Sequence, residues 1–158
     1  MTVAVTSYPG SSTVKNSSNE GRHLDRKRVL LADDHVAVLE QVGALLARDH
    51  EVVGTAANGQ ALVEAAQKLL PDVIVTDISM PIMNGFEAAA KLRSLGLTAK
   101  VIFLSVQSSP AYIKKARSLG ASGYVLKLYA AEQLPEAIAV VLAGGTYISP
   151  ELNFPVQI

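Results

Sequence analysis

Short apolar runs alternate with stretches of helical periodicity along most of this 158-residue chain. From residue 28 onward, five apolar runs have the length of buried strands, and each is followed by apolar residues that recur every three or four positions. Strands separated by helices pair in parallel, because parallel strands need crossover connections whose helices cover the sheet. The pattern predicts an α/β fold: a doubly wound, five-stranded parallel sheet flanked by five helices. The predicted strands are Arg28–Ala32, Glu51–Ala56, Val73–Thr76, Lys100–Ser105 and Gly123–Leu126.

The last predicted helix contains a proline close to its start. Its apolar stripe runs from Leu134 to Leu142, and Pro135 falls early in it. A helix that starts near Glu132 would keep Pro135 in the first turn, where its missing N–H costs no intrahelical hydrogen bond. The preceding residues 128–131 offer no polar N-cap side chain.

The first 27 residues follow neither the strand nor the helix pattern. They are rich in Ser, Thr, Asn and Gly, and they lack the apolar run of about 7–15 residues that a signal peptide needs. Residues 1–27 are therefore predicted to be a flexible N-terminal extension, with a partner-docking arm as the alternative. Residues 28–151 are predicted to form one domain, and residues 152–158 a short C-terminal tail with no output domain.

Composition excludes several classes of protein. The chain has no cysteine, hence no disulfide and no cysteine-based zinc site. Its apolar runs are shorter than the ~18 residues of a membrane span, so no membrane association is expected and a cytoplasmic location is predicted. The net charge is zero, whereas a nucleic-acid-binding domain is normally basic. The charge is also unevenly placed: residues 1–27 carry four basic and two acidic side chains, and residues 28–158 carry ten and twelve.

Polar side chains follow four of the five predicted strands. Asp33 and Asp34 follow the first strand, Asp77 follows the third, Ser105 ends the fourth and Lys127 follows the fifth. Ligands of doubly wound sheets bind at the carboxyl ends of the strands. We therefore expect three carboxylates, one hydroxyl and one ammonium to converge on one edge of the sheet.

That set of groups suits magnesium-dependent chemistry on a phosphoryl group. Close carboxylates repel one another unless a cation offsets them, and Mg²⁺ prefers a few carboxylate oxygens. Lys127 and Ser105 are suited to hold phosphoryl oxygens, and Asp77 is the best placed nucleophile for an aspartyl-phosphate. Taken singly, each residue also has a structural interpretation: Asp33 or Asp34 as a helix cap, Asp77 and Ser105 as turn residues, Lys127 as a solvated side chain.

Residues 28–151 resemble the receiver domain of two-component response regulators, most closely the receivers of LuxR/NarL-type transcription factors. The resemblance rests on RVLLADDH, PDVIVTDISMPIMNGFEA, VIFLS, ARSLGASGYVLK and LAGGTYISPEL, which occur in the family's order and spacing. It implies the flavodoxin-like receiver fold and a bacterial phosphorelay protein that is switched by phosphorylation. It also implies that the domain is no enzyme in the ordinary sense, because it phosphorylates and dephosphorylates only itself.

The resemblance implies a role for each matching position. Asp77 matches the phosphoacceptor; Asp34 matches the direct Mg²⁺ ligand, Asp33 its neighbouring acid, and the backbone carbonyl of Ser79 a further ligand. Lys127 matches the lysine that contacts the phosphoryl group. Ser105 matches the switch hydroxyl, and Tyr124 matches the aromatic that follows its movement.

The resemblance also implies partners. These are a sensor histidine kinase or a phosphotransfer protein, and it allows a homodimer through the last helix. LuxR/NarL-type regulators continue into a helix-turn-helix domain, whereas only seven residues follow Glu151 here. We therefore expect a stand-alone receiver or a fragment of a longer regulator, with no direct nucleic-acid binding by this chain.

Two further residues lie beside the expected site. Val106 departs from the family pattern, and Gln107 flanks the site. Val106 follows Ser105 at a position that is usually Ala or Gly, so we hypothesise that its methyl groups narrow access to the phosphoryl site. Gln107, together with Ser79, flanks the path of hydrolytic water and is predicted to modulate the lifetime of the phosphoryl group.

Three other functions compete with this interpretation. A haloacid-dehalogenase-type phosphatase would need an acid two positions after Asp77, where Ser79 stands. A flavodoxin-like cofactor binder would need a phosphate loop after the first strand, where Asp33 and Asp34 would repel phosphate. The main alternative is a pseudo-receiver that binds partners independently of phosphorylation.

Overall fold

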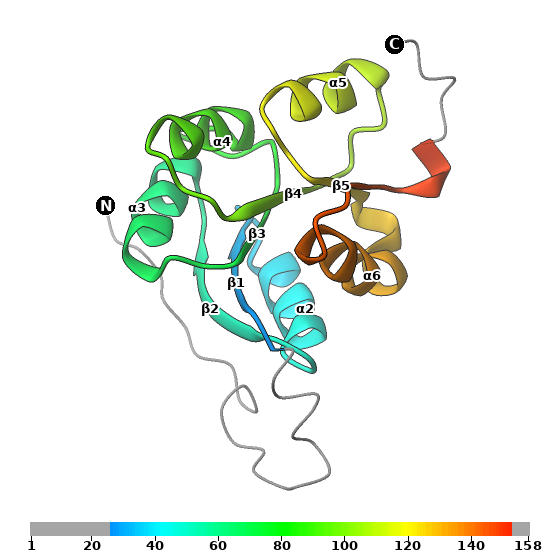
Figure 1. The fold of residues 1–158 in the computed structure, drawn as a ribbon, viewed down its shortest axis with the longest axis horizontal. Coiled ribbons are helices and arrows are strands. Elements are labelled where there is room, and N and C mark those ends of the chain that lie inside the picture. The colour runs from blue at the N-terminus through cyan, green and yellow to red at the C-terminus, as the bar shows by residue number, and fades with distance from the viewer. Residues whose placement is uncertain (1–25, 153–158) are drawn as a thin grey trace, which may run out of the picture.

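A parallel sheet of six strands runs through the middle of the structure, in the order β2-β1-β3-β4-β5-β6 (Figure 1). The computed structural model describes residues 26–152; most of the predicted extension and nearly all of the predicted tail lie outside the described residues. The order of the strands reverses at β1, which lies between β2 and β3. The five predicted strands are confirmed as β1 (Arg28–Ala32), β2 (Glu51–Ala56), β3 (Val73–Thr76), β4 (Lys100–Ser105) and β5 (Gly123–Leu126).

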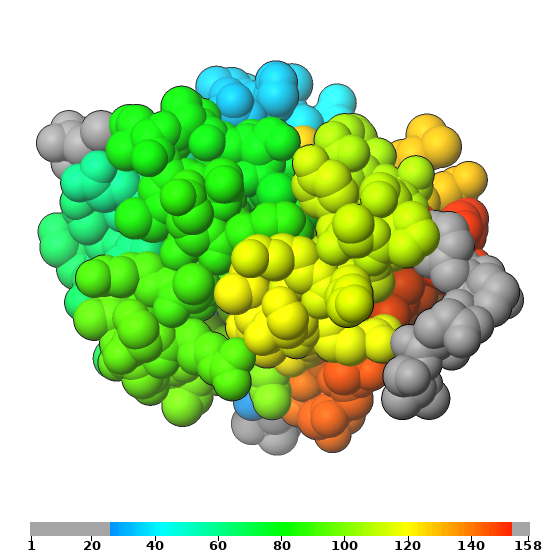
Figure 2. Space-filling view, turned by 90° about the horizontal axis from the view of Figure 1, so that it is seen from above, coloured from blue at the N-terminus to red at the C-terminus, as the bar shows by residue number. Residues whose placement is uncertain are grey.

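Five α-helices cover the two faces of this sheet. Alternate residues of each central strand point to opposite faces: Val29 and Leu31 of β1 pack against α2 and α6, whereas Leu30 and Ala32 pack against α3 and α4. Figure 2 views the face on which α4 and α5 lie side by side. None of the described helices combines the length and the apolar character that crossing a membrane requires. The helices are α2 (Val36–Leu46), α3 (Gly59–Leu69), α4 (Gly85–Ser94), α5 (Pro110–Ser118) and α6 (Ala130–Leu142).

A sixth strand extends the predicted sheet at the β5 edge. β6 (Tyr147–Ile148) pairs in parallel with Gly123 and Tyr124 of β5. Two residues are too few to show the alternation by which a strand is recognised in a sequence. A 3₁₀ turn, η3 (Pro150–Leu152), follows this strand.

The last helix begins earlier than predicted. α6 starts at Ala130, directly after the 3₁₀ turn η2 (Lys127–Tyr129), so Pro135 lies inside the helix rather than in its first turn. The expectation of a start near Glu132 was wrong. The 3₁₀ turn ends at Tyr129 and Ala130 already has a helical backbone conformation, so the α-helix continues directly from Ala130. Pro135 leaves the carbonyl of Ala131 without its helical donor, and the exposure of Ala131 lets water replace that donor. As predicted, no side chain caps this helix start.

His50 lies at the end of the domain opposite the carboxyl ends of the strands, where burial shifts its pKa. His50 Nδ1 accepts a hydrogen bond from the Lys27 N–H at 3.2 Å, and its carbonyl accepts one from Arg26 at 3.0 Å. Burial lowers the pKa of His50, with a raising effect from Asp49 and a lowering one from Arg26. The unfolded chain therefore binds a proton more readily than the folded protein.

We expect the free energy of unfolding to fall as the pH drops from about 6.5, the ordinary histidine value, through the lowered folded pKa. Protonation removes the acceptor of the Lys27 N–H, so the fall should be absent in His50→Asn, whose side-chain oxygen keeps an acceptor there. Urea unfolding of both proteins between neutral and mildly acidic pH measures the difference. Parallel curves would show that another group causes the pH dependence.

Candidate functional site

The carboxyl ends of β1 and β3 place two buried aspartates next to each other. The Asp33 N–H donates to the Ala56 carbonyl at 3.0 Å and the Asp77 N–H donates to the Ala32 carbonyl at 2.9 Å, so both backbones continue the parallel ladder one residue past their strands. The two aspartates are 2% and 5% exposed. Their positions are therefore set by the sheet rather than by a mobile loop.

Lys127 bridges these two carboxylates from the end of β5. Its Nζ lies 2.7 Å from Asp33 Oδ2 and 3.0 Å from Asp77 Oδ2. The contact with Asp77 is also a hydrogen bond. One cation thus offsets two carboxylates that would otherwise repel each other in a poorly solvated place. The prediction that these three groups converge is confirmed by their geometry, although their chemical roles stay predictions.

The ionisation of this cluster reflects its burial. Burial raises the pKa of Asp77, and the negative charge of Asp33 adds to that effect, while the hydrogen bonds from Lys127 and from the Ile78 N–H oppose it. The Ile78 N–H donates to Asp77 Oδ1 at 2.7 Å. Burial lowers the pKa of Lys127, but the hydrogen bonds and charges of the two carboxylates outweigh it, and the pKa is raised. Lys127 therefore stays charged beside an Asp77 carboxylate that is costly to ionise.

His35 joins the site although its sequence context did not single it out as functional. Its Nδ1 lies 3.0 Å from Asp33 Oδ1 and 3.1 Å from Asp34 Oδ1, and its backbone N–H donates to Asp33 Oδ1 at 2.9 Å. Asp34 itself lies at the mouth of the site, with a side chain that is 33% exposed. The only sequence signal was the position of His35 directly after the two aspartates.

The donor atoms of this cluster suit a small, hard cation. Asp33, Asp34, His35 and Asp77 each offer a ligand atom, and these atoms lie within 4.8 Å of one another. Asp33 Oδ2 is buried, and it shares the Lys127 ammonium, 2.7 Å away, with Asp77. One ammonium shared by two buried carboxylates leaves a net negative charge, which a further cation would offset. The carboxylate oxygens of this cluster fit Mg²⁺, which prefers oxygen ligands. The exposed carboxylate of Asp34 also leaves room for the several water molecules that the ion keeps.

A chain of hydrogen bonds connects the end of β4 to the aromatic residue on β5. Ser105, 1% exposed, accepts a hydrogen bond from the Gln107 N–H at 3.0 Å. The Tyr124 hydroxyl donates to the Gln107 carbonyl at 2.7 Å. Burial raises the pKa of Tyr124, while a hydrogen bond with Ser105 lowers it. Tyr124 is thus held inward, 2% exposed, by the loop that follows Ser105.

Besides Asp34, two further predicted site residues lie at the surface. Val106 is 71% exposed, and Ser79 is also exposed. The role expected of Ser79 belongs to its backbone carbonyl, and that role stays a prediction. The exposed position of Val106, directly after Ser105, is compatible with the hypothesis that it narrows access.

Gly85, at the start of α4, packs against the backbone of Asp77 and Ile78. The Gly85 N–H donates to the Ile78 carbonyl at 2.7 Å, which joins the start of α4 to the residue after Asp77. A Cβ atom at Gly85 would stand 2.1 Å from the Asp77 carbonyl oxygen, far inside van der Waals contact. Only glycine permits this close approach. The sequence shows Gly85 as a helix-start residue, and the tertiary contact alone reveals its steric role.

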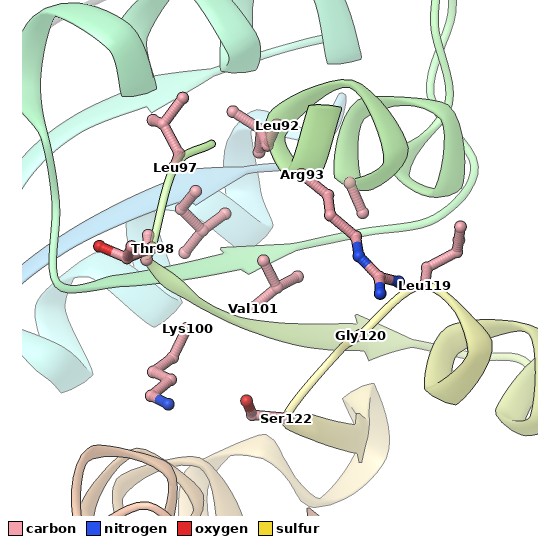
Figure 3. A pocket seen from close by; sticks show the side chains of 12 residues that line it. Leu92, Arg93, Leu97, Thr98, Lys100, Val101, Leu119, Gly120 and Ser122 are labelled. Carbon is pink, nitrogen blue, oxygen red and sulfur yellow. The ribbon is translucent and has the colours of Figure 1, made fainter. Parts of the chain in front are cut away.

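A separate cavity of about 270 Å³ lies at the amino ends of β4 and β5, at the opposite edge of the sheet (Figure 3). Arg93 extends from α4 toward Leu119 and Gly120, and it donates to the Ser118 carbonyl at 3.3 Å. None of the predicted site residues lines this cavity. It therefore has no part in the carboxylate site.

Comparison with known proteins connects this geometry to one family. The response regulator receiver domain family matches residues 29–139. The chain is 38% identical to the transcriptional regulatory protein DegU of Brevibacillus brevis over 85% of this chain and 58% of that protein. It is also 38% identical to the nitrate/nitrite response regulator NarL of Escherichia coli K12, over 79% of this chain and 59% of that protein.

Solved structures agree with these sequence relatives. A LuxR-family two-component response regulator from Aurantimonas sp. SI85-9A1 superposes with a TM-score of 0.78 at 32% identity, covering 81% of this chain and 93% of that chain. The receiver domain of the NarL regulator from Mycobacterium tuberculosis gives a TM-score of 0.72 at 34% identity, covering 75% and 98%. The chain thus spans about three-fifths of the length of the curated relatives named above.

Proposed function

This chain belongs to the response regulator receiver domain family, and we propose that it accepts a phosphoryl group from a histidine kinase or phosphotransfer protein onto Asp77 and thereby switches a protein-interaction surface. Family membership supports phosphorelay signalling and disfavours the phosphorylation-independent pseudo-receiver. The observation that carries the residue-level proposal is the contact of Lys127 Nζ with both Asp33 and Asp77.

The reaction transfers a phosphoryl group between two proteins. A carboxylate oxygen of Asp77 attacks phosphorus, the P–N bond to the donor imidazole breaks, and the electron pair leaves with that nitrogen. The Ile78 N–H holds Asp77 Oδ1, which leaves the other oxygen on the Lys127 side. Lys127 then holds a phosphoryl oxygen by a charge-assisted hydrogen bond.

The proposed Mg²⁺ ligands are the side chains of Asp33, Asp34 and Asp77 and the backbone carbonyl of Ser79. When bound, the ion supplies the positive charge that lets a dianionic phosphoryl group approach a cluster of carboxylates. Asp33 keeps its buried charge through Lys127, and the exposed Asp34 leaves an open path for the ion and its waters. Ser105 is proposed as the hydroxyl that moves toward the phosphoryl group, with Tyr124 following through Gln107.

The partners of the whole protein are part of the proposal. Of the relatives named above, DegU is a transcriptional regulatory protein and NarL is a nitrate/nitrite response regulator. For this chain we propose a cytoplasmic signalling role with a kinase or phosphotransfer donor and a homodimeric state. No catalytic turnover of a free substrate is proposed.

Labelling with a small phosphodonor tests the proposed function. Acetyl phosphate with Mg²⁺ should add the mass of one phosphoryl group to the intact protein, and the label should be lost on brief alkaline treatment, as expected of an acyl phosphate. EDTA should abolish the labelling. A protein that takes up no phosphoryl group from acetyl phosphate or from a phosphorylated phosphotransfer protein would be the pseudo-receiver instead.

Val106 provides a test of access to this site. In Val106→Ala, loading by acetyl phosphate should be faster by about threefold, which corresponds to less than 1 kcal/mol of activation free energy, because two exposed methyl groups no longer narrow the approach. The rate of appearance of the phosphorylated mass measures the effect. Leu95→Ala, which shortens another exposed side chain at the end of α4, is the control, and equal rates in all three proteins would contradict the hypothesis.

A further inference from the structure

The last described segment of the chain is bound along the free edge of β5. We call residues Tyr147–Leu152 the C-terminal strap. The Ser149 N–H donates to the Tyr124 carbonyl at 2.9 Å, and Ser149 Oγ accepts the Leu126 N–H at 2.9 Å. The strap therefore continues the hydrogen bonding of β5 beyond the two paired residues of β6, and Figure 1 shows it at the edge of the sheet.

A buried polar network holds the middle of the strap against α6. Ser149 is 1% exposed, and its hydroxyl donates to Gln133 Oε1. Gln133 Nε2 in turn donates to Glu151 Oε1 at 2.7 Å. Ser149 thus joins β5 and α6 through both its backbone and its side chain. A buried network of this kind fixes the position of the strap more firmly than a single surface contact would.

The end of the strap enters the core beside the candidate switch. Leu152 is 4% exposed and belongs to a hydrophobic cluster that also contains Tyr124, Phe103 and Ile78. Ile78 is the residue whose N–H donates to Asp77 Oδ1. One side chain of the strap therefore shares a packed cluster with a neighbour of the proposed phosphoacceptor and with the tyrosine.

Tyr124 links the strap to the far side of this cluster. Its carbonyl accepts from the strap, whereas its hydroxyl donates to the Gln107 carbonyl in the loop after Ser105. The Gln107 N–H returns to Ser105 Oγ. Because Leu152 of the strap belongs to the same hydrophobic cluster as Tyr124, a shift of the tyrosine side chain would change the surface on which the strap is bound.

We propose that Ser149 and Leu152 are positioning residues of the switch, and that the strap is bound more tightly when Asp77 is phosphorylated. This inference rests on the proposed function. In the structure, the inward Tyr124, its bond to Gln107 and the bound strap occur together. A phosphoryl group would add one acceptor for the Ser105 hydroxyl; because Tyr124 is already inward, the proposed movement of Ser105 would stabilise this arrangement rather than create it.

The coupling has to act in both directions. If phosphorylation tightens the strap, then weakening the strap reduces the population of the arrangement that favours phosphorylation. A molecule that binds the strap would therefore change the extent of phosphorylation at Asp77, and phosphorylation would change the affinity of the strap for that molecule. The strap is in this way the readout surface of the switch at the β5 edge.

Hydrogen–deuterium exchange of the peptide covering residues 146–152 measures the coupling in the full chain. With acetyl phosphate and Mg²⁺, exchange of this peptide should slow by about threefold or more as the phosphorylated mass appears. In Leu152→Ala this phosphorylation-dependent change should vanish and the phosphorylated fraction should fall, whereas Leu152→Met should restore both. Leu70→Ala, a truncation of an exposed leucine after α3, should behave as the parent.

A second variant tests the link without phosphorylation. Tyr124→Phe keeps the ring but loses the hydroxyl bond to Gln107, and it should speed exchange of the strap by about fivefold, as expected for one lost hydrogen bond, while exchange of β1 stays unchanged. If the parent is phosphorylated and strap exchange does not slow, the coupling is overturned although the proposed function stands. If no phosphoryl group is accepted, the proposed function fails, and unchanged strap exchange in Tyr124→Phe would overturn the link as well.

Discussion

Asp77→Asn should take up no phosphoryl group from acetyl phosphate under conditions in which the parent is fully labelled. The amide is a far weaker nucleophile than a carboxylate, and the neighbouring Asp33 and Asp34 lie on another strand end and are not positioned by the Ile78 N–H. The loss should be complete within detection, which makes this the largest functional effect expected of a single substitution here. Intact-mass measurement after labelling gives the answer directly.

The same substitution should leave the fold intact or stabilise it. Burial and the charge of Asp33 raise the pKa of Asp77, so its ionised form is costly in the folded protein at neutral pH. Asparagine keeps the size and an acceptor for the Ile78 N–H but carries no charge. We expect the urea midpoint of Asp77→Asn to equal or exceed that of the parent, so the loss of labelling cannot be attributed to unfolding.

Asp49→Asn is the matched control for this experiment. Asp49 is exposed and lies before β2, away from the carboxyl ends of the strands. It should be labelled at the parent rate. Labelling of Asp77→Asn at an unchanged level would place the phosphoryl group on another residue and would remove Asp77 from the proposal.

Gly85→Ala should have the largest effect on stability. The added Cβ would stand 2.1 Å from the Asp77 carbonyl oxygen and 2.9 Å from the Ile78 Cα, both of them backbone atoms in a packed region. The overlap has to be relieved by moving either the start of α4 or the loop that carries Asp77. We expect a loss of about 3 kcal/mol or more in the free energy of unfolding, as for severe overpacking, together with slower phosphorylation.

Gly96→Ala separates this steric effect from the conformational freedom of glycine. Gly96 has a φ of +77°, and a Cβ there would meet nothing within 4 Å. Its replacement should cost only about 1 kcal/mol, the cost of a left-handed backbone with a side chain, and should leave labelling unchanged. Equal unfolding midpoints for the two variants, measured in urea, would show that Gly85 has no steric role beneath Asp77.

The sequence by itself determined the bounds and the parallel direction of the five main strands and the edge at which the polar groups meet. All five main strands have the predicted bounds because each is a short apolar run buried on both faces, and β1 shows this with alternate residues in two different hydrophobic clusters. Parallel pairing then places the residues that follow β1, β3 and β5 at the same edge of the sheet. For that reason the sequence alone predicts one shared edge for Asp33, Asp77 and Lys127.

The tertiary structure decided what depends on exact approach between distant segments. Lys127 and Asp77 are 50 positions apart, and only the packed sheet shows that one ammonium contacts two carboxylates. The sequence pattern likewise missed His35 as a site residue and missed β6, since a single imidazole and a two-residue strand carry no periodic signal. The contact of Gly85 with Asp77 and the strap that reaches Tyr124 through Ser149 come from side-chain and backbone packing across the fold. Hydrophobic periodicity specifies which face of an element is buried, whereas the partner that each buried group meets is set by the close packing of the whole domain.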